Sequence, residues 1–489
     1  MSLSQALANA SSALAVSSRR AGVTSNNIAN ALTDGFNRRD VTIVERAVGG
    51  AGAGVAVAGI ARATNPAVTF ERRGADAEFA ASDARANAFT RIGDLLGGPD
   101  DPNALFQRFA KLETTLRTLA DTPDSGAAQL TTVNAAKDLA SGLNRIANEF
   151  QTLRGNADAE ISRRVSAVNT DLQEIERLNT AIGRGGATGG DVSALLDQRQ
   201  LVIDRINESI PVRELQRDNG KIDLMTQEGV FLLVGTARTV EFTPAPVMTA
   251  QSAYNNGAGA LSGLSVDGDD ITPGGTATLA VREGAFAGLF DVRDRLVPET
   301  ALALDAVALD LAERFSGPGL DPTLAPGAPG LFTDAGALVN SATLTGLAGR
   351  IEINAAVDPA NGGLASRLRD GLGAAAPAAA GSDVFVRALI DVMNTDRPVD
   401  AALQTSRDVN ASEAAAQLTS LAGAGRAAAV ARAAGAQTLA VSLAESEKLE
   451  TGVDTDRELQ NLITIEQAFA ANARVIQTVD RMLQRLMEI

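Results

Sequence analysis

The sequence predicts a mainly α-helical protein: an elongated helical bundle with coiled-coil-like N- and C-terminal helices and a small β-rich insert. Three observations support this. All sixteen prolines lie between Pro66 and Pro398, so both ends lack the residue that helix interiors exclude. In both ends, and in residues 126–182, apolar residues recur every three or four positions, which is typical of one face of a helix. Strand-like alternation is largely confined to the middle of the chain.

Each end of the chain carries a narrow apolar stripe. Near the N terminus the stripe consists of Leu3, Leu7, Ala10 and Leu14. Near the C terminus the residues that repeat every seven positions are Leu462, Phe469, Ile476 and Leu483. Such stripes are typical of a coiled-coil seam, and an ordinary core-facing helix gives the same pattern. Their place at the two extreme ends favours pairing with each other or with neighbouring molecules.

The first half of the interior is dominated by helical periodicity. A helix is expected over 102–121, followed by a long one over 126–182, which would extend about 85 Å at 1.5 Å per residue. Before them, the segment "GGAGAGVAVAGI" at 49–60 alternates and predicts a strand or a hairpin arm.

The second half begins with strands. Asn219-Gly220 separates two alternating runs, a strong signal for a β-hairpin within 212–242. A helix is expected over 297–315, then a loop-rich segment, and then Ala-rich helices from residue 383 onward. The expected domains are a terminal helical domain of 1–40 and 450–489, an elongated helical domain of 41–315 and 400–449, and a variable, loop-rich and β-rich outer insert of 316–399.

Composition excludes several classes of function. The chain has no cysteine and no histidine, so a zinc site built on thiolate or imidazole and a Ser-His-Asp or Cys-His nucleophile are impossible. The formal net charge of −16 argues against a nucleic-acid partner, which requires a basic face. No apolar run approaches 18 residues, so no membrane insertion is expected. The first 20 residues lack the apolar core of a signal peptide, which leaves both a cytoplasmic location and leaderless export open.

Two motifs resemble binding loops by composition but lack the residues that such loops require. "GRGGATGG" at 183–190 has no Lys-Ser/Thr for a phosphate loop and predicts a helix–helix turn. "DGDD" at 267–270 lacks the register of an EF-hand and predicts an acidic surface turn. No catalytic constellation and no cofactor site are expected. A helical enzyme built on carboxylates is the alternative that a pair with shifted pKa values in a closed pocket would support.

Asn26, Asn27 and Asn30 cluster where the first helix should end. Asparagine competes for nearby backbone groups and is a poor residue in a helix interior. These side chains could therefore satisfy the last carbonyls of the helix, or they could hydrogen-bond a partner along a packed interface.

The segment "TSNNIANALTDGFNRRD" at 24–40 resembles the N-terminal signature of the axial proteins of the bacterial flagellum, which include rod, hook and hook–filament junction proteins. Leu32 and Asp34 depart from the usual Asn and Pro of that signature. The C-terminal "EQAFAANARVIQTVD" is similar to the same family, and the interior "ALLDQRQLVIDRINESIPV" at 194–212 resembles its hook–filament junction members.

The resemblance implies a structural subunit, with no catalysis and no cofactor, that forms the junction between hook and filament and is needed for filament assembly. A flagellar hook or distal rod protein is the alternative. It also implies type III export without a cleaved signal peptide, to an extracellular place in the flagellum. The implied partners are further copies in a ring, the hook protein, the second junction protein, an export chaperone and the export apparatus. The expected assembly interface comprises Leu3, Leu7, Leu14, Asn26, Asn27, Asn30, Leu462, Phe469, Asn472, Ile476 and Leu483.

Overall fold

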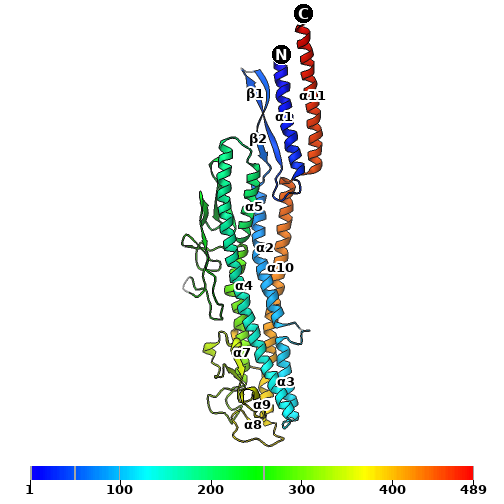
Figure 1. Ribbon diagram of the computed structural model, residues 1–489. Helices are drawn as coiled ribbons and strands as arrows, with labels where there is room; N and C mark the ends of the chain where they lie inside the picture. The colour runs from blue at the N-terminus through cyan, green and yellow to red at the C-terminus, as the bar shows by residue number, and fades with distance from the viewer. Residues whose placement is uncertain (1–2, 49–50, 99, 257–258, 488–489) are drawn as a thin grey trace.

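The computed structural model describes residues 3–48, 51–98, 100–256 and 259–487. The chain forms a long rod of helices, with both termini at the same end (Figure 1). Small antiparallel sheets lie along the rod, and those of the middle of the chain lie on the outer side of α4 (Figure 1). This architecture confirms the predicted mainly α-helical class with a small β-rich part.

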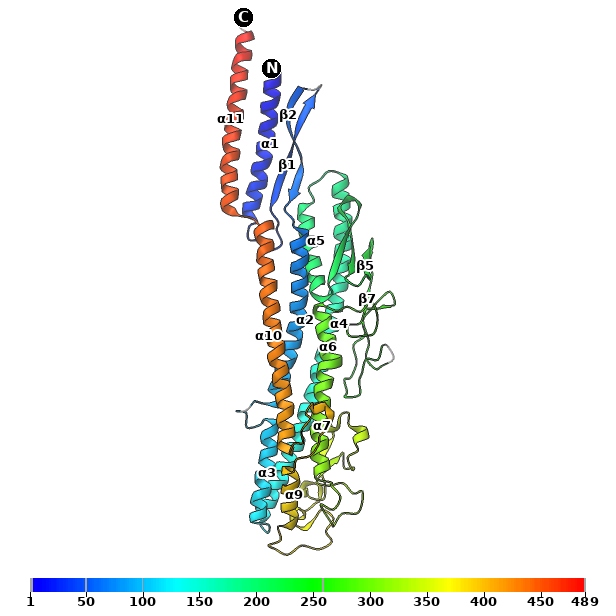
Figure 2. The ribbon, with the colours of Figure 1, turned by 180° about the vertical axis from the view of Figure 1, so that it is seen from behind.

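Four elements make up the end of the rod that holds the termini, and we call them the terminal unit. Helices α1 and α11 lie side by side, and a two-stranded antiparallel hairpin lies against α1 (Figures 1 and 2). The strand expected over 49–60 is observed from Ala51 onward, and residues 49–50 lie outside the described part. The unit consists of α1 (Leu3–Ala29), β1 (Arg39–Val48), β2 (Ala51–Arg62) and α11 (Thr455–Met487).

Long helices carry the rod away from the terminal unit. Helix α2 packs along α10 over much of the length, and α4 runs beside them (Figure 1). Asn65 caps α2 by accepting hydrogen bonds from the backbone of Ala67 and Val68, and Pro66 supplies the first helical position without needing a donor. The helices are α2 (Pro66–Leu96), α3 (Leu105–Asp121), α4 (Gly126–Ala187), α5 (Ser193–Ser209) and α10 (Ala411–Thr451).

The expectation of a turn over 183–190 is partly wrong, because α4 continues through the glycines as far as Ala187. A side chain at Gly183 would lie 2.5 Å from Lys221, and one at Gly185 would lie 2.5 Å from Val192. These glycines therefore allow close packing inside a helix. The turn follows only at 188–190.

Two small sheets flank the C-terminal half of α4. Asn219 and Gly220, both with positive φ, form the tight connection between β3 and β4, as the sequence predicts. "DGDD" falls in the β8–β9 hairpin. The first sheet has the order β3 (Val212–Gln216), β4 (Ile222–Thr226), β5 (Phe231–Val234) and β6 (Thr236–Ala237), and the second β7 (Val240–Glu241), β8 (Ser265–Val266) and β9 (Asp269–Asp270).

The end of the rod opposite the termini is capped by the segment expected as an insert. Phe332, Ile351 and Leu368 of this segment are buried in the same apolar core as Leu143 of α4, so the segment packs into the rod. Its domain boundary remains a prediction. The remaining elements are α6 (Gly284–Asp291), a π-helical turn (Val292–Leu296), α7 (Val297–Arg314), β10 (Phe332–Asp334), β11 (Ile351–Ile353), α8 (Arg367–Asp370) and α9 (Val384–Asn394).

The rod has two apolar cores. One joins α3, the first half of α4, α7, α10 and the capping segment. The other joins the second half of α4, α5, α6 and the sheets. Within the described chain, neither core includes a residue of the terminal unit.

Candidate assembly interface and the joint beneath it

The two predicted stripes meet each other within one chain, because α1 packs along α11 (Figure 2). The most buried apolar residues of α11 are Ile465 and Val479. Neither belongs to the seven-residue repeat that was expected to form the centre of the contact. Half-buried are Leu3, Leu7, Leu14, Leu462, Asn472 and Ile476, whereas Phe469 and Leu483 are more exposed. The role of these residues in assembly stays a prediction.

Large apolar side chains of α11 remain exposed outside this contact. At 100° per residue, Leu459 and Ile463 lie on one flank of the helix, and Met482 and Leu486 lie on the other. Their exposed fractions are 49%, 55%, 50% and 60% respectively. A helix that is apolar on several sides is normally buried, so α11 carries more apolar surface than α1 covers.

A groove of about 720 Å³ runs between α1, the hairpin and α11. It is lined mainly by small residues of α1 and β2, with Val475 and Asn472 from α11. The side-chain oxygen of Asn9, which also lines it, is buried and lacks a hydrogen-bond partner. The predicted residue Asn472 therefore lies at an open part of the terminal unit.

The three asparagines have different surroundings. Asn27 is fully buried and binds both backbone groups of Arg39: its Nδ2 donates to the carbonyl at 2.9 Å and its Oδ1 accepts from the amide at 3.1 Å. Asn27 thus fastens the end of α1 to the start of β1. Asn30 donates to the carbonyl of Asn26 at 2.9 Å, as expected for a side chain that satisfies the end of a helix. The side chain of Asn26 is exposed.

Beneath the terminal unit lies a joint made of polar contacts. Asp197 of α5 binds Arg39 at the start of β1, with 2.9 Å between Oδ2 and Nη2. The same carboxylate binds Arg62, the register partner of Arg39 at the end of β2, with 2.5 Å between Oδ1 and Nε. Gln200, one turn later, accepts from Arg62 and donates to Glu447 of α10 at 3.4 Å. One face of α5 therefore touches both the hairpin and α10.

The turn that follows α1 also rests on α5. Gly35 has φ +71°, and a side chain there would lie 2.5 Å from the Leu201 side chain. Only glycine adopts this conformation without strain, and only a residue without a Cβ fits over Leu201. The backbone amide of Arg38 donates to the carbonyl of Thr451 at 2.8 Å, which ties the same turn to the end of α10.

Sequence reasoning missed this joint, because its residues are far apart in the chain. The available signal was the segment 194–212, which resembles the junction proteins and contains Asp197 and Gln200. The opposed pair Arg39 and Arg62 becomes visible only once the hairpin register is known.

Two family models match the chain. Residues 89–317 match the flagellar hook-associated protein FlgK helical domain. Residues 450–489 match the flagellar basal body rod FlgEFG protein C-terminal model. The first match covers a little under half of the chain. Over these residues the chain is similar to flagellar hook-associated protein FlgK, and at its C terminus it is similar to the rod proteins.

Relatives of known name resemble this chain at modest identity. Flagellar hook-associated protein 1 of Salmonella typhimurium is 25% identical over 328 residues, which cover 64% of this chain and 56% of that protein. The Bacillus subtilis protein of the same name is 22% identical over 338 residues, which cover 63% of this chain and 66% of that protein. The matches thus span a little over half to two thirds of these relatives. A solved structure, the flagellar hook junction protein FlgK from Burkholderia pseudomallei, aligns with TM-score 0.42 and 20% identity over 54% of this chain and 46% of that one.

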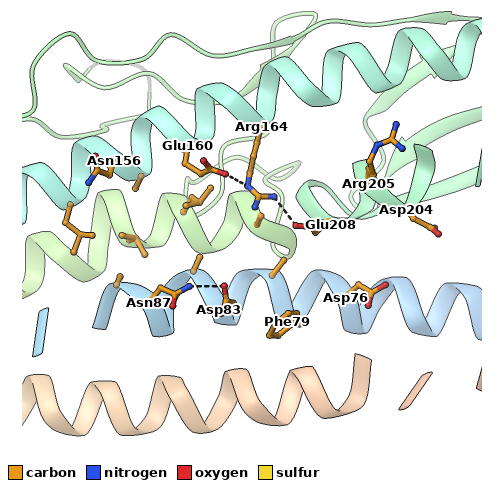
Figure 3. Close-up of a pocket in the computed structure, with 18 of the residues that line it drawn as sticks. Asp76, Phe79, Asp83, Asn87, Asn156, Glu160, Arg164, Asp204, Arg205 and Glu208 are labelled. Atoms are coloured by element: carbon orange, nitrogen blue, oxygen red, sulfur yellow. Dashed lines mark hydrogen bonds and ion pairs between the residues drawn. The ribbon is translucent and has the colours of Figure 1, made fainter. Parts of the chain in front are cut away.

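A groove of about 820 Å³ lies between α2, α4, α5 and α6 (Figure 3). Phe79 and other apolar side chains form part of its lining. Arg164 lies between Glu160 and Glu208, at 2.9 and 3.2 Å, and bonds both carboxylates (Figure 3). Burial raises the pKa of the Asp76 carboxyl above its ordinary value, against the effect of the nearby Arg72 guanidinium. The lining carries five carboxylates and two guanidinium groups. The groove is open, whereas the enzyme alternative calls for a closed pocket.

Two properties of the described residues bear on other functions. No group of three or more Asp or Glu residues there is placed to hold a metal ion. One helical stretch within Ala411–Met487 is long and apolar enough to cross a membrane, with mean hydropathy 1.2 over 18 residues, of which 11% are buried. Length and composition alone do not separate a membrane span from a helix that other subunits cover.

Proposed function

We propose that this chain is a structural subunit of the bacterial flagellum that joins the hook to the filament and is needed for filament assembly. The observation that carries the proposal is the excess apolar surface of α11 on a unit that sits at one end of the rod. The similarity to flagellar proteins supplies the flagellar context. Covering that surface requires other molecules, because the described chain offers no further element at this end.

The proposed interface has two parts with different tasks. The residues of the closed seam, Ile476 among them, hold α11 against α1 and so build the terminal unit. The exposed flanks of α11, marked by Leu459, Ile463, Met482 and Leu486, contact neighbouring subunits. A subunit that uses different flanks on its two sides forms a heterologous contact, which closes into a ring or continues as a helix.

The proposed partners are other copies of this chain, the hook protein, the second junction protein, an export chaperone and the export apparatus. Export proceeds without a cleaved signal peptide, and the subunit has no catalytic task and needs no cofactor. The absence of cysteine and histidine supports the non-enzymatic assignment. A flagellar hook or distal rod protein is the alternative, and the match of 450–489 to a rod protein model is compatible with it.

Electron microscopy of a strain that lacks this protein tests the function. Hooks without filaments, with flagellin released into the medium, would support the junction role. Absence of the hooks themselves would favour the alternative, because hook and distal rod proteins are needed earlier in assembly. Re-expression of the intact chain in the same strain is the control.

A matched pair of variants in that strain tests the interface. Ile463→Asp places a charge on the exposed flank of α11, and Gln467→Asp places the same charge on an exposed polar residue that lies between the two flanks. Burying an unpaired carboxylate in a subunit contact costs several kcal/mol, so we expect Ile463→Asp to be exported and to give no filaments. Gln467→Asp should keep filaments. Normal filaments with Ile463→Asp would exclude this flank from the interface.

A further inference from the structure

We propose that one face of α5, centred on Asp197, sets the direction of the terminal unit relative to the rod. The terminal unit adds no residue to either apolar core of the described chain. Non-directional apolar packing therefore does not orient it. Polar contacts do depend on direction, and at the joint they come largely from α5.

The hairpin register shows why Asp197 holds the central position. Arg39 and Arg62 are directly opposite each other where the two strands meet the rod. Like charges at opposed positions destabilise a strand pair, unless an anion lies between them. Asp197 supplies that anion and bonds both guanidinium groups, and all three side chains are largely buried, with 13%, 13% and 9% exposed. The two opposed guanidinium groups thus bind one carboxylate from both strands.

The same face of α5 continues toward the other long helices. Asp204 lies seven residues after Asp197 and so on the same side of the helix. It binds Arg72 at 2.8 Å and Arg73 at 2.6 Å, both on α2. Arg72 also binds Glu447 of α10. One helical face thus fixes the hairpin with Asp197 and the two long helices below it with Asp204.

The joint is not saturated with hydrogen bonds. Three buried side-chain nitrogens there, Nε of Arg38, Nε of Arg39 and Nη2 of Arg73, have no hydrogen-bond partner. Buried polar groups normally have hydrogen-bond partners. Since several donors at the joint already lack one, the remaining contacts there compensate little for the loss of a hydrogen bond. Removing the charge of Asp197 leaves two guanidinium groups facing each other without a bridging anion. We expect the terminal unit then to sample a wider range of angles.

The absence of cysteine allows this angle to be measured on the full chain. Spin labels at Thr478→Cys on α11 and Thr180→Cys on α4, both exposed, report the distance across the joint by pulsed electron paramagnetic resonance. Helix α11 has 33 residues and is roughly 50 Å long, so a rotation of about 10° moves its tip by about 9 Å. Because the isolated chain is measured, the result is independent of whether the chain joins hook to filament.

The charge of Asp197 is then varied. We expect Asp197→Asn to broaden or shift the distance distribution, and Asp197→Glu to restore most of the narrow one. The matched control is Asp171→Asn, which breaks the ion pair between Asp171 of α4 and the exposed Arg205 of α5 and should leave the distribution unchanged. An unchanged distribution in Asp197→Asn would overturn the proposal, and the backbone bond from Arg38 to Thr451 would then be the better candidate.

A second set of variants changes the arginines of the hairpin that bind Asp197. In the double variant Arg39→Gln and Arg62→Gln, the distribution should already be broad, and adding Asp197→Asn should change it little. Further broadening would mean that Asp197 acts through other groups, which contradicts the proposal. Circular dichroism melting of each variant checks that the rod itself stays folded, so that a change of angle is not mistaken for unfolding.

Discussion

The seam between α1 and α11 leads to a prediction about Ile476. This residue is half-buried on α11, one turn before the buried Val479. Replacing it with aspartate removes roughly half of an isoleucine burial, about 1 kcal/mol, and the new carboxylate can turn toward water. The cost falls on the terminal unit alone, because this unit shares no apolar core with the rod in the described chain.

The comparison is Leu143→Asp in α4. Leu143 is fully buried in the larger apolar core, so the change loses about 2–3 kcal/mol of burial and adds several kcal/mol for a buried carboxylate. Native proteins are stable by only about 5–15 kcal/mol. Leu143→Asp should therefore unfold the rod, whereas Ile476→Asp should lower the main melting temperature by less than about 2 °C.

Two measurements separate these outcomes. Circular dichroism melting reports the rod, and hydrogen exchange of α11 amides reports the seam. For Ile476→Asp we expect an unchanged main transition, faster exchange in α11, and cells that export the protein but lack filaments. A fall in melting temperature as large as that of Leu143→Asp would refute the view that the terminal unit folds apart from the rod.

Three further predictions concern single sites. Gly35→Ala should destabilise the turn after α1 more than Gly189→Ala destabilises the turn after α4. Both glycines have φ near +70°, but only Gly35 lacks space for a Cβ, and limited proteolysis of the two turns checks the difference. Asn27→Ala should cost about 1–3 kcal/mol, since it leaves buried backbone groups unpaired, while the exposed Asn26→Ala should be neutral in urea unfolding. Burial raises the pKa of Asp305 from 3.8 to about 6. Its contribution to the free energy of unfolding is therefore fully present below about pH 4 and is lost as the pH rises through 6, by at most about 3 kcal/mol. The free energy of unfolding should be lower at pH 7.5 than at pH 5, and Asp305→Asn should remove this difference.

Local patterns of the sequence determined the helices and the main hairpin. The long helix was expected over 126–182 and is observed from Gly126 to Ala187. Asn219-Gly220 identified the β3–β4 connection because its positive φ angles are a property of these residues. Such features depend on neighbours a few positions away, so periodicity and turn chemistry suffice to predict them.

Only the tertiary structure decided which side chains meet. The glycines after residue 182 stay helical, and Lys221 and Val192 lie so close to them that a larger side chain would not fit without a shift. The seam centres on Ile465 and Val479, because its registry depends on how α1 and α11 cross. Asp197 lies 158 residues from Arg39, and no local pattern links the two. The energy of a long-range ion pair depends on distance and burial, which exist only after the hairpin, α5 and α10 have come together.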